Sequence, residues 1–445
     1  MNELEELIAR INGITAGNAH LSIDQERKIV EELNSFFFAT YDGIGTVPAF
    51  GKDFQYFSDF HKFWHEHHEE ILNVRINDEN CEKVADALHD VYLCTGGRVF
   101  TEVYDTCGLS KQEICRIRFL TANQDFNGSR NFTDLAERYE KNQNAFSVRR
   151  INSDPDAFIK TISVTKLSQT DKRASYAKNI TQFLIDHGVE EPFDIIDCFD
   201  RDVFKFREAL IAYEGTGYGN KKTDMFIRDM IVLGVWTGVT GFEKIDVASD
   251  VNTIKIALKS GILNCEIPLV SSFIDIFSYQ YGLIDYQSSQ AWRRVWEIWK
   301  TKYPSENIAS PCLLDYFVYN VLGRQFCKEK LCWFECSNGH KFANAGARRK
   351  YCPVCQAEHR ENVGTTLISR DLPCSCEEGK LVIEKSPFTE LGIATPSLTQ
   401  CPLKEICDAC GKKRLNAPKS ISILGQTGWN SAYSEKGTGG GGLMA

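Results

Sequence analysis

The sequence lacks any long apolar run and any excess of positive charge. No stretch approaches the ~20 apolar residues that a membrane-spanning helix requires, so we expect no membrane partner. The formal net charge is -9, which argues against a protein that coats nucleic acid through a basic surface. An enzyme that contacts phosphates through backbone amides and a few local cations remains compatible with this charge.

The sequence also lacks a secretory signal and an internal repeat. Its first residues, MNELEELIARING, contain neither the basic segment nor the apolar core of a signal peptide, so we expect a cytoplasmic protein. The chain has 445 residues, of which 43% are hydrophobic and 25% charged. This length and composition are typical of a globular protein with two or three domains.

Apolar side chains recur at the three-to-four residue spacing of amphipathic helices. The spacing predicts helices over 112–120, 131–141, 156–162, 173–188, 202–213, 221–234, 252–261 and 289–303. Trp292, Trp296 and Trp299 lie on one face of the last helix, where we expect core packing. We predict a mostly α fold in four parts: an N-terminal helical domain over 1–105, a helical core over 106–326, a Cys-rich module over 327–415 and a flexible tail over 416–445.

The most informative segment is a glycine-rich turn between two of these helices. The first helix is expected to end at Tyr213 and the second to begin near Asn220 or Lys221. Three glycines alternate in the turn: Gly215, Gly217 and Gly219. Such a turn can point backbone N–H groups outward at a helix start, where they bind an anion such as phosphate. The asparagine at 220 breaks both GxxxxGK[ST] and GxGxxG, and a plain glycine-rich helix end is the alternative interpretation.

Three segments resemble the helix-hairpin-helix DNA glycosylases, the group of endonuclease III and the 8-oxoguanine glycosylases. GYGNKKTD fits the family hairpin L-x-G-x-G-x-K-x-A-(D), with Lys221 at the lysine position. RFLTANQDF at 118–126 stands where the family has a segment like L-L-S-A-Q-A-T-D. SDVNTIKIALKSG fits V-D-T-H-V-x-R-V-x-x-R-L-G through Asp250, Ile256 and Gly261. The resemblance covers about half of the chain and implies a helix-hairpin-helix glycosylase core.

The resemblance implies that Lys221 and Asp250 are catalytic. A carboxylate beside the sugar stabilises the positive charge that develops as the bond to the base breaks. A neutral lysine amine can attack the anomeric carbon, expel the base and leave a Schiff base, which would add AP-lyase activity. The pair is 29 residues apart, further than in much of the family, although archaeal 8-oxoguanine glycosylases also have a long spacing. Asp246 is the rival carboxylate, and a solvated lysine and a helix N-cap are the structural alternatives.

The resemblance also implies which residues contact DNA. The hairpin glycines 215, 217 and 219 would present amides to phosphate. Lys222 is expected either to contact phosphate or to pack away from it. Asn123 and Gln124 occupy the place where the family inserts a polar side chain into the gap left by the flipped nucleotide, with a polar helix end as the alternative.

Ten of the 17 cysteines lie between Cys327 and Cys410, and such a local cluster in a reduced compartment indicates metal binding. The spacing Cys336-x3-His340-x11-Cys352-x2-Cys355 predicts a tetrahedral zinc site, in which Cys332 is the alternative to His340.

The family often has a [4Fe-4S] loop, C-x6-C-x2-C-x5-C, after its last core helix. LLDYFVYNVLGRQFC resembles the helix before that loop, and CPLKEIC resembles its last pair, although residue 398 is serine. The resemblance implies an iron–sulfur cluster or a second zinc, bound by four of a larger set: Cys327, Cys332, Cys374, Cys376, Cys401, Cys407 and Cys410.

The expected partner is DNA, and no protein partner can be inferred. An additional N-terminal domain and a zinc module favour a specialised substrate, such as the bulky glucosylated hydroxymethylcytosine that anti-phage glycosylases remove. Two other functions stay open: a nucleoside or nucleotide N-ribohydrolase of the queuosine-salvage type, and a non-catalytic zinc-containing DNA-binding protein.

The cysteine spacing leads to a first prediction about metal content. Purified protein should contain about one zinc per chain, because Cys336, His340, Cys352 and Cys355 form a complete tetrahedral set. Protein prepared anaerobically should also be brown, because an iron–sulfur cluster absorbs visible light. Cys336→Ser should lose the zinc and destabilise the module, since metal binding and folding are coupled. Elemental analysis checks this, and colourless protein with two zincs and no iron would exclude the cluster.

Overall fold

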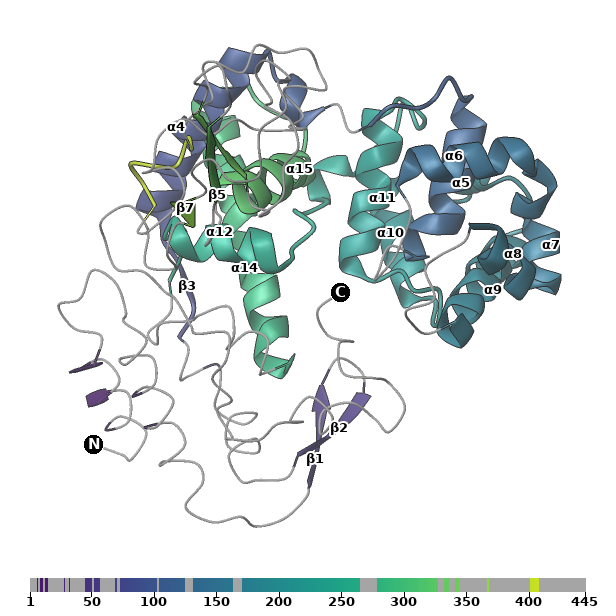
Figure 1. Ribbon diagram of the computed structural model, residues 1–445, viewed down its shortest axis with the longest axis horizontal. Coiled ribbons are helices and arrows are strands. Elements are labelled where there is room, and N and C mark those ends of the chain that lie inside the picture. Colours follow the sequence, from purple (N-terminus) through teal and green to yellow (C-terminus); the bar gives the residue numbers. More distant parts are fainter. Residues whose placement is uncertain are drawn as a thin grey trace. The chain divides into compact units, whose positions relative to one another are not determined.

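The structure is a computed structural model, shown in Figure 1. A few single residues before 70 are described, and otherwise it describes 45–49, 52–56, 73–101, 104–124, 131–162, 170–264, 278–326, 332–335, 341–344, 366–367 and 401–407. Of these residues 70% are helical, which confirms the predicted mostly α fold.

The helices predicted from apolar spacing between residues 112 and 303 are all present. The long ones are α4 (Asp78–Thr95), α5 (Lys111–Thr121), α6 (Phe132–Lys141), α8 (Pro155–Ile162), α9 (Thr170–Asp186), α10 (Val203–Ala212), α11 (Asn220–Val232), α12 (Val251–Lys259) and α14 (Ser278–Lys302). Short helices join them: η1 (Arg98–Phe100), η2 (Ala122–Gln124), η3 (Gln143–Phe146), α7 (Val148–Ser153), η4 (Pro192–Phe199), η5 (Phe242–Lys244), η6 (Pro311–Leu313), α15 (Leu314–Tyr316) and the π-helix η7 (Phe317–Phe326).

The chain divides into two compact units that do not follow the ranges predicted from the sequence. Unit 1 comprises 1–95, 249–306 and 318–445. Unit 2 comprises 96–248 and 307–317. The predicted ranges place α4 in the N-terminal domain and α12 and α14 in the core, whereas all three helices belong to unit 1.

Unit 1 is built around the packing of α14 on α4 and α12. Trp292 and Trp299 are fully buried and Trp296 is 5% exposed, so the expected core role of this face is confirmed. The indole N–H of Trp292 donates to the Thr253 carbonyl at 3.3 Å, and that of Trp299 donates to the Glu306 carbonyl at 2.9 Å. The two fully buried indoles therefore have their polar atoms bonded, as burial requires.

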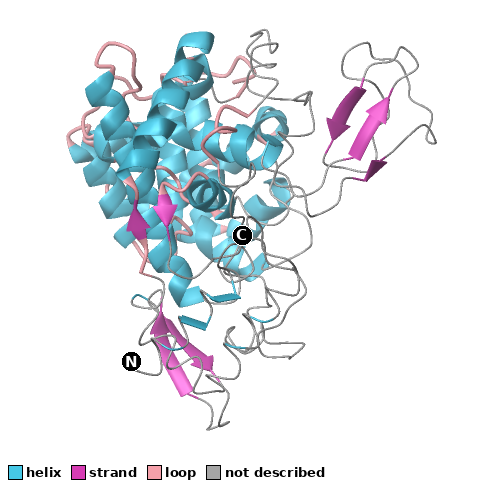
Figure 2. Ribbon diagram, turned by 90° about the vertical axis from the view of Figure 1, so that its left-hand side faces the viewer, coloured by secondary structure: helices cyan, strands magenta, loops and turns pink. Residues whose placement is uncertain are grey.

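The strands form three small antiparallel sheets, coloured magenta in Figure 2. One pairs β3 (Arg75–Ile76) with β4 (Leu263–Asn264), and another joins β5 (Cys332–Glu335), β6 (Lys341–Asn344) and β7 (Thr366–Leu367). The third pairs β1 (Gly45–Ala49) with β2 (Lys52–Tyr56). It lies in the range predicted as helical, and the alternating polar and apolar residues of KDFQY fit a strand better than a helix.

Unit 2 has an aromatic core around Phe206. The rings of Phe183, Phe226 and Trp236 lie 5.3–6.5 Å from that of Phe206, mostly edge to face, and all four side chains are fully or almost fully buried. These residues come from α9, α10, α11 and the segment that follows α11. The aromatic core therefore joins the helices on both sides of the glycine turn.

Buried ion pairs join the same helices. On α11, Arg228 and Asp229 are adjacent; Arg228 bonds Asp315, and Asp229 bonds Arg118 of α5 at 3.0 Å. These side chains are all less than 10% exposed. If one of these charges had no partner, its desolvation would cost roughly several kcal/mol of folding free energy. The paired set therefore fixes how α11 is rotated about its axis within unit 2.

Candidate functional site

The predicted helix-turn-helix is present in unit 2. Helix α10 ends at Ala212 with Tyr213 as its C-cap, and α11 begins at Asn220 with Gly219 as its N-cap. Gly215 and Gly217 have φ values of +74° and +75°, which side-chain-bearing residues rarely adopt. Gly219 differs, because its φ of -102° is open to any residue.

Helix α9 packs directly against this turn. A Cβ atom on Gly217 would lie 2.7 Å from Cγ and 2.8 Å from Cε2 of the Tyr176 ring. A Cβ atom on Gly215 would overlap the side-chain amide of Asn179, which donates to the Gly215 carbonyl at 3.0 Å. Nothing lies within 4 Å of the corresponding position on Gly219. Gly217 is thus required both by the close approach of the Tyr176 ring and by φ, whereas Gly215 is required by φ.

Asn123 and Gln124 are buried in η2 rather than exposed to a nucleic acid. Asn123 is 0% exposed, and its Nδ2 donates to the Thr216 carbonyl at 2.9 Å. Gln124 is 2% exposed, and it exchanges bonds with Arg173 of α9 through its side-chain Nε2 and its backbone carbonyl. This geometry does not fit the expectation that both side chains insert into DNA. Asn123 instead fixes the backbone of the glycine turn.

Lys222 packs against the protein, which is one of the two roles expected for it. Its Nζ donates to the Asn123 carbonyl at 2.9 Å, so the ammonium is bonded to η2. The residue is half-buried. A phosphate contact would have to replace this bond.

Lys221 is the second residue of α11 and is half-buried. The first turn of α11 is described throughout and contains no acidic residue. Lys221 is therefore placed beside the backbone N–H groups at the start of the helix.

Asp250 is the N-cap of α12 and is 8% exposed. Its Oδ1 accepts from the backbone N–H groups of Asn252 at 2.8 Å and Thr253 at 3.0 Å, which completes a capping box. Asp250 is therefore a helix N-cap, as the structural alternative predicted. A helix N-cap can also have a catalytic role. Asp250 belongs to unit 1, whereas Lys221 and Asp246 belong to unit 2.

Arg207 and Asp224 support the start of α11, and no motif in the sequence points to this pair. Arg207 Nε donates to Asp224 Oδ1 at 2.5 Å, and its Nη2 donates to Asp224 Oδ2 and to Asn220 Oδ1, both at 3.1 Å. Burial raises the pKa of the Asp224 carboxyl to about 7, although the Arg207 hydrogen bonds act in the opposite direction. The nearby charge of Asp246 raises this pKa further.

Most of the expected metal ligands lie outside the described residues: Cys327, Cys336, His340, Cys352, Cys355, Cys374, Cys376 and Cys410. Cys332 begins β5. Cys401 and Cys407 are half-buried thiols on a turn in which the Cys407 N–H donates to the Leu403 carbonyl at 2.8 Å. Within the described residues, no group of three potential metal ligands occurs.

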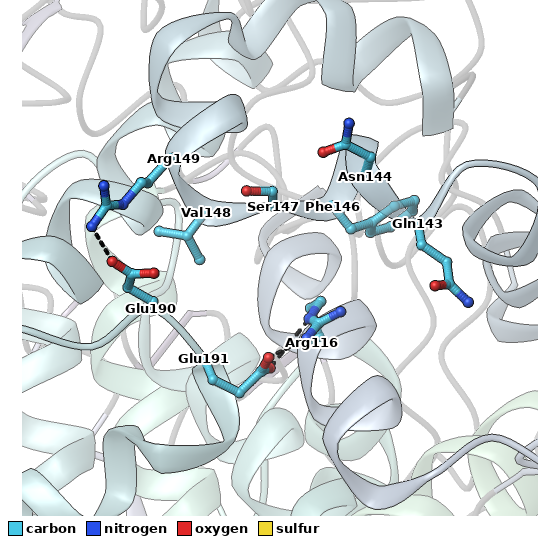
Figure 3. Close-up of a pocket in the computed structure, with 9 residues that line it drawn as sticks. All are labelled: Arg116, Gln143, Asn144, Phe146, Ser147, Val148, Arg149, Glu190 and Glu191. Atoms are coloured by element: carbon cyan, nitrogen blue, oxygen red, sulfur yellow. Dashed lines mark hydrogen bonds and ion pairs between the residues drawn. The ribbon is translucent and has the colours of Figure 1, made fainter.

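A polar cavity of about 390 Å³ lies elsewhere in unit 2. Figure 3 shows Arg116 directed at Glu191 and Arg149 directed at Glu190 across its lining. Arg116 also donates to the Tyr139 hydroxyl at 2.9 Å. Each guanidinium in this lining already has a carboxylate partner, and none of the residues predicted for catalysis or DNA contact borders the cavity.

No protein-family model matches the chain, and no curated protein matches it. The resemblance to helix-hairpin-helix glycosylases therefore stands on the three quoted motifs. Among the described helices, none is both long enough and apolar enough to cross a membrane.

The packing of the turn leads to a second prediction, with a matched control inside the turn. Gly217→Ala should lower the free energy of unfolding by about 1–3 kcal/mol, because the methyl group meets Tyr176 and φ is unfavourable. Gly219→Ala should leave it nearly unchanged, since the position is open and its φ is ordinary. Chemical denaturation measures both. Equal losses in the two variants would contradict the close approach of α9.

Proposed function

We propose that this protein is a DNA glycosylase that flips a modified or damaged base out of DNA and cleaves its N-glycosidic bond. The observation that most supports the proposal is the turn between α10 and α11. Its first two glycines have left-handed φ values, and it leads into a helix whose N-cap has no side chain. Amides at such a helix start suit a phosphate of the DNA backbone.

Lys221 is the proposed nucleophile. It lies in the first turn of α11, directly after the phosphate-binding turn, so a DNA backbone bound there would pass beside it. Attack by its amine on the anomeric carbon breaks the bond to the base, whose nitrogen takes the electron pair and then a proton. The first product is an aminal in which C1′ carries both the lysine nitrogen and the ring oxygen O4′. The nitrogen then loses a proton and forms a double bond to C1′ as the C1′–O4′ bond breaks, O4′ takes up a proton, and the result is a Schiff base between protein and sugar.

Asp250 is the proposed carboxylate that stabilises the positive charge on the sugar. Two backbone N–H groups of α12 bond its Oδ1 and hold the carboxylate in one orientation. The low exposure of the residue would strengthen its interaction with a developing cation. Asp246 is the alternative candidate for this carboxylate, and it lies in the same unit as Lys221.

We also propose that the Cys-rich region binds zinc at Cys336, His340, Cys352 and Cys355, with a second metal centre that includes Cys401 and Cys407. The two described thiols are not in a disulfide and fit a pair of metal ligands. Either metal would be structural. A bulky phage-type modified base such as glucosylated hydroxymethylcytosine is the proposed substrate.

The third prediction tests the nucleophile. Borohydride added during turnover should reduce the Schiff base and link the protein covalently to DNA, and Lys221→Gln should abolish this product. Denaturing electrophoresis detects the link. Lys178→Gln, which removes an exposed lysine of α9, is the matched control and should still be trapped.

The same assay distinguishes the two carboxylates. Asp250→Asn should keep DNA affinity but slow base release by about 10²–10⁴-fold. Asp246→Asn should have a mild effect. Free base without any trapped protein would show a monofunctional enzyme in which Asp250 activates water. Base release at the wild-type rate by Asp250→Asn would contradict the assignment of this residue.

A further inference from the structure

One face of α9 continues the surface of the glycine turn. Lys172, Ser175, Tyr176 and Asn179 share this face, because residues three, four and seven positions apart lie on one side of a helix. Ser175 is exposed and the other three are half-buried. We call these four residues the α9 ridge.

The ridge and the turn are in direct contact. The Asn179 amide donates to the Gly215 carbonyl at 3.0 Å and to the Ser175 hydroxyl at 3.4 Å. The Tyr176 ring occupies the space beside Gly217. A strand bound to the amides of the turn would therefore meet the ridge next.

Lys172 gives the ridge a positive charge. Its Nζ lies 5.7 Å from the centre of the Tyr176 ring, and in the described part of the chain it makes no ion pair. Two other cations near the turn are already bonded, Lys222 to the Asn123 carbonyl and Arg207 to Asp224.

The acidic residues of the neighbouring segments lie outside the ridge. Glu214 is exposed in the turn and Asp171 is exposed beside Lys172. Asp186, at the far end of α9, accepts from the Tyr213 hydroxyl at 2.6 Å and from Gln182 at 2.7 Å. The ridge itself contains no acid.

We propose that the α9 ridge binds the sugar–phosphate backbone of the DNA strand that the turn contacts, with Lys172 paired to a phosphate. This inference rests on the proposed function and extends the DNA contact beyond the hairpin. A cation, an aromatic ring, an amide and a hydroxyl are the groups that proteins use against phosphate and sugar. The ridge would add affinity without reading the base sequence.

The fourth prediction uses the salt dependence of DNA binding. For Lys172→Gln, the plot of log binding constant against log salt concentration should lose about 0.9 from its slope, the effect of one released counterion. Lys172→Arg should restore the slope. The control is Lys178→Gln, which removes an exposed charge from the flank of α9 next to Asn152 and should leave the slope unchanged.

Full-length protein and duplex DNA are used throughout, and thermal unfolding confirms that each variant is folded. If Lys172→Gln and Lys178→Gln have the same slope as the wild type, the ridge does not contact phosphate. If both lower the slope equally, the effect is one of overall charge and the proposal also fails. A wild type that does not bind DNA would instead overturn the proposed function.

Discussion

The ring of Tyr176 lies where the Cβ atom of any residue other than glycine at 217 would be. This contact determines which residue can stand at 217, since α9 can come this close only where the turn has no side chain. The Asn123 amide bonds Thr216 within the same turn, and the Lys222 ammonium bonds the Asn123 carbonyl. The amides proposed to bind phosphate are therefore fixed by two neighbouring helices before any DNA arrives, which lowers the entropy lost on binding.

The position of α11 depends on charges that are buried in pairs. Asp224 bonds Arg207, while Arg228 and Asp229 bond Asp315 and Arg118. Removing one partner would leave a charge in a region with little water, so these residues tolerate few substitutions. Because Asp224 lies one helical turn after Lys221, the same pairs that stabilise unit 2 also fix the helix start that presents the proposed nucleophile.

Local signals in the sequence were sufficient for the helices and for the turn, because apolar spacing, caps and glycines act over a few residues. The sequence did not reveal the packing partners. Asn123 contacts Thr216 from 93 residues away, and Asn179 contacts Gly215 from 36 residues away. A polar residue that bonds a distant carbonyl has the same local sequence pattern as one that faces DNA. The sequence therefore left both interpretations of Asn123 and Gln124 open, DNA contact and a polar helix end. The pairing of Arg207 with Asp224 likewise needs the turn to be folded.

The central claim is that this chain releases a base from DNA. The most direct test incubates the purified protein with DNAs that contain damaged or phage-type modified bases, and identifies the released bases by mass spectrometry. The account predicts that at least one DNA yields a free base together with an equal number of abasic or cleaved sites. Hydrolysis of free nucleosides without release from any DNA would contradict the claim and identify an N-ribohydrolase, and DNA binding without any released base would identify a non-catalytic binding protein.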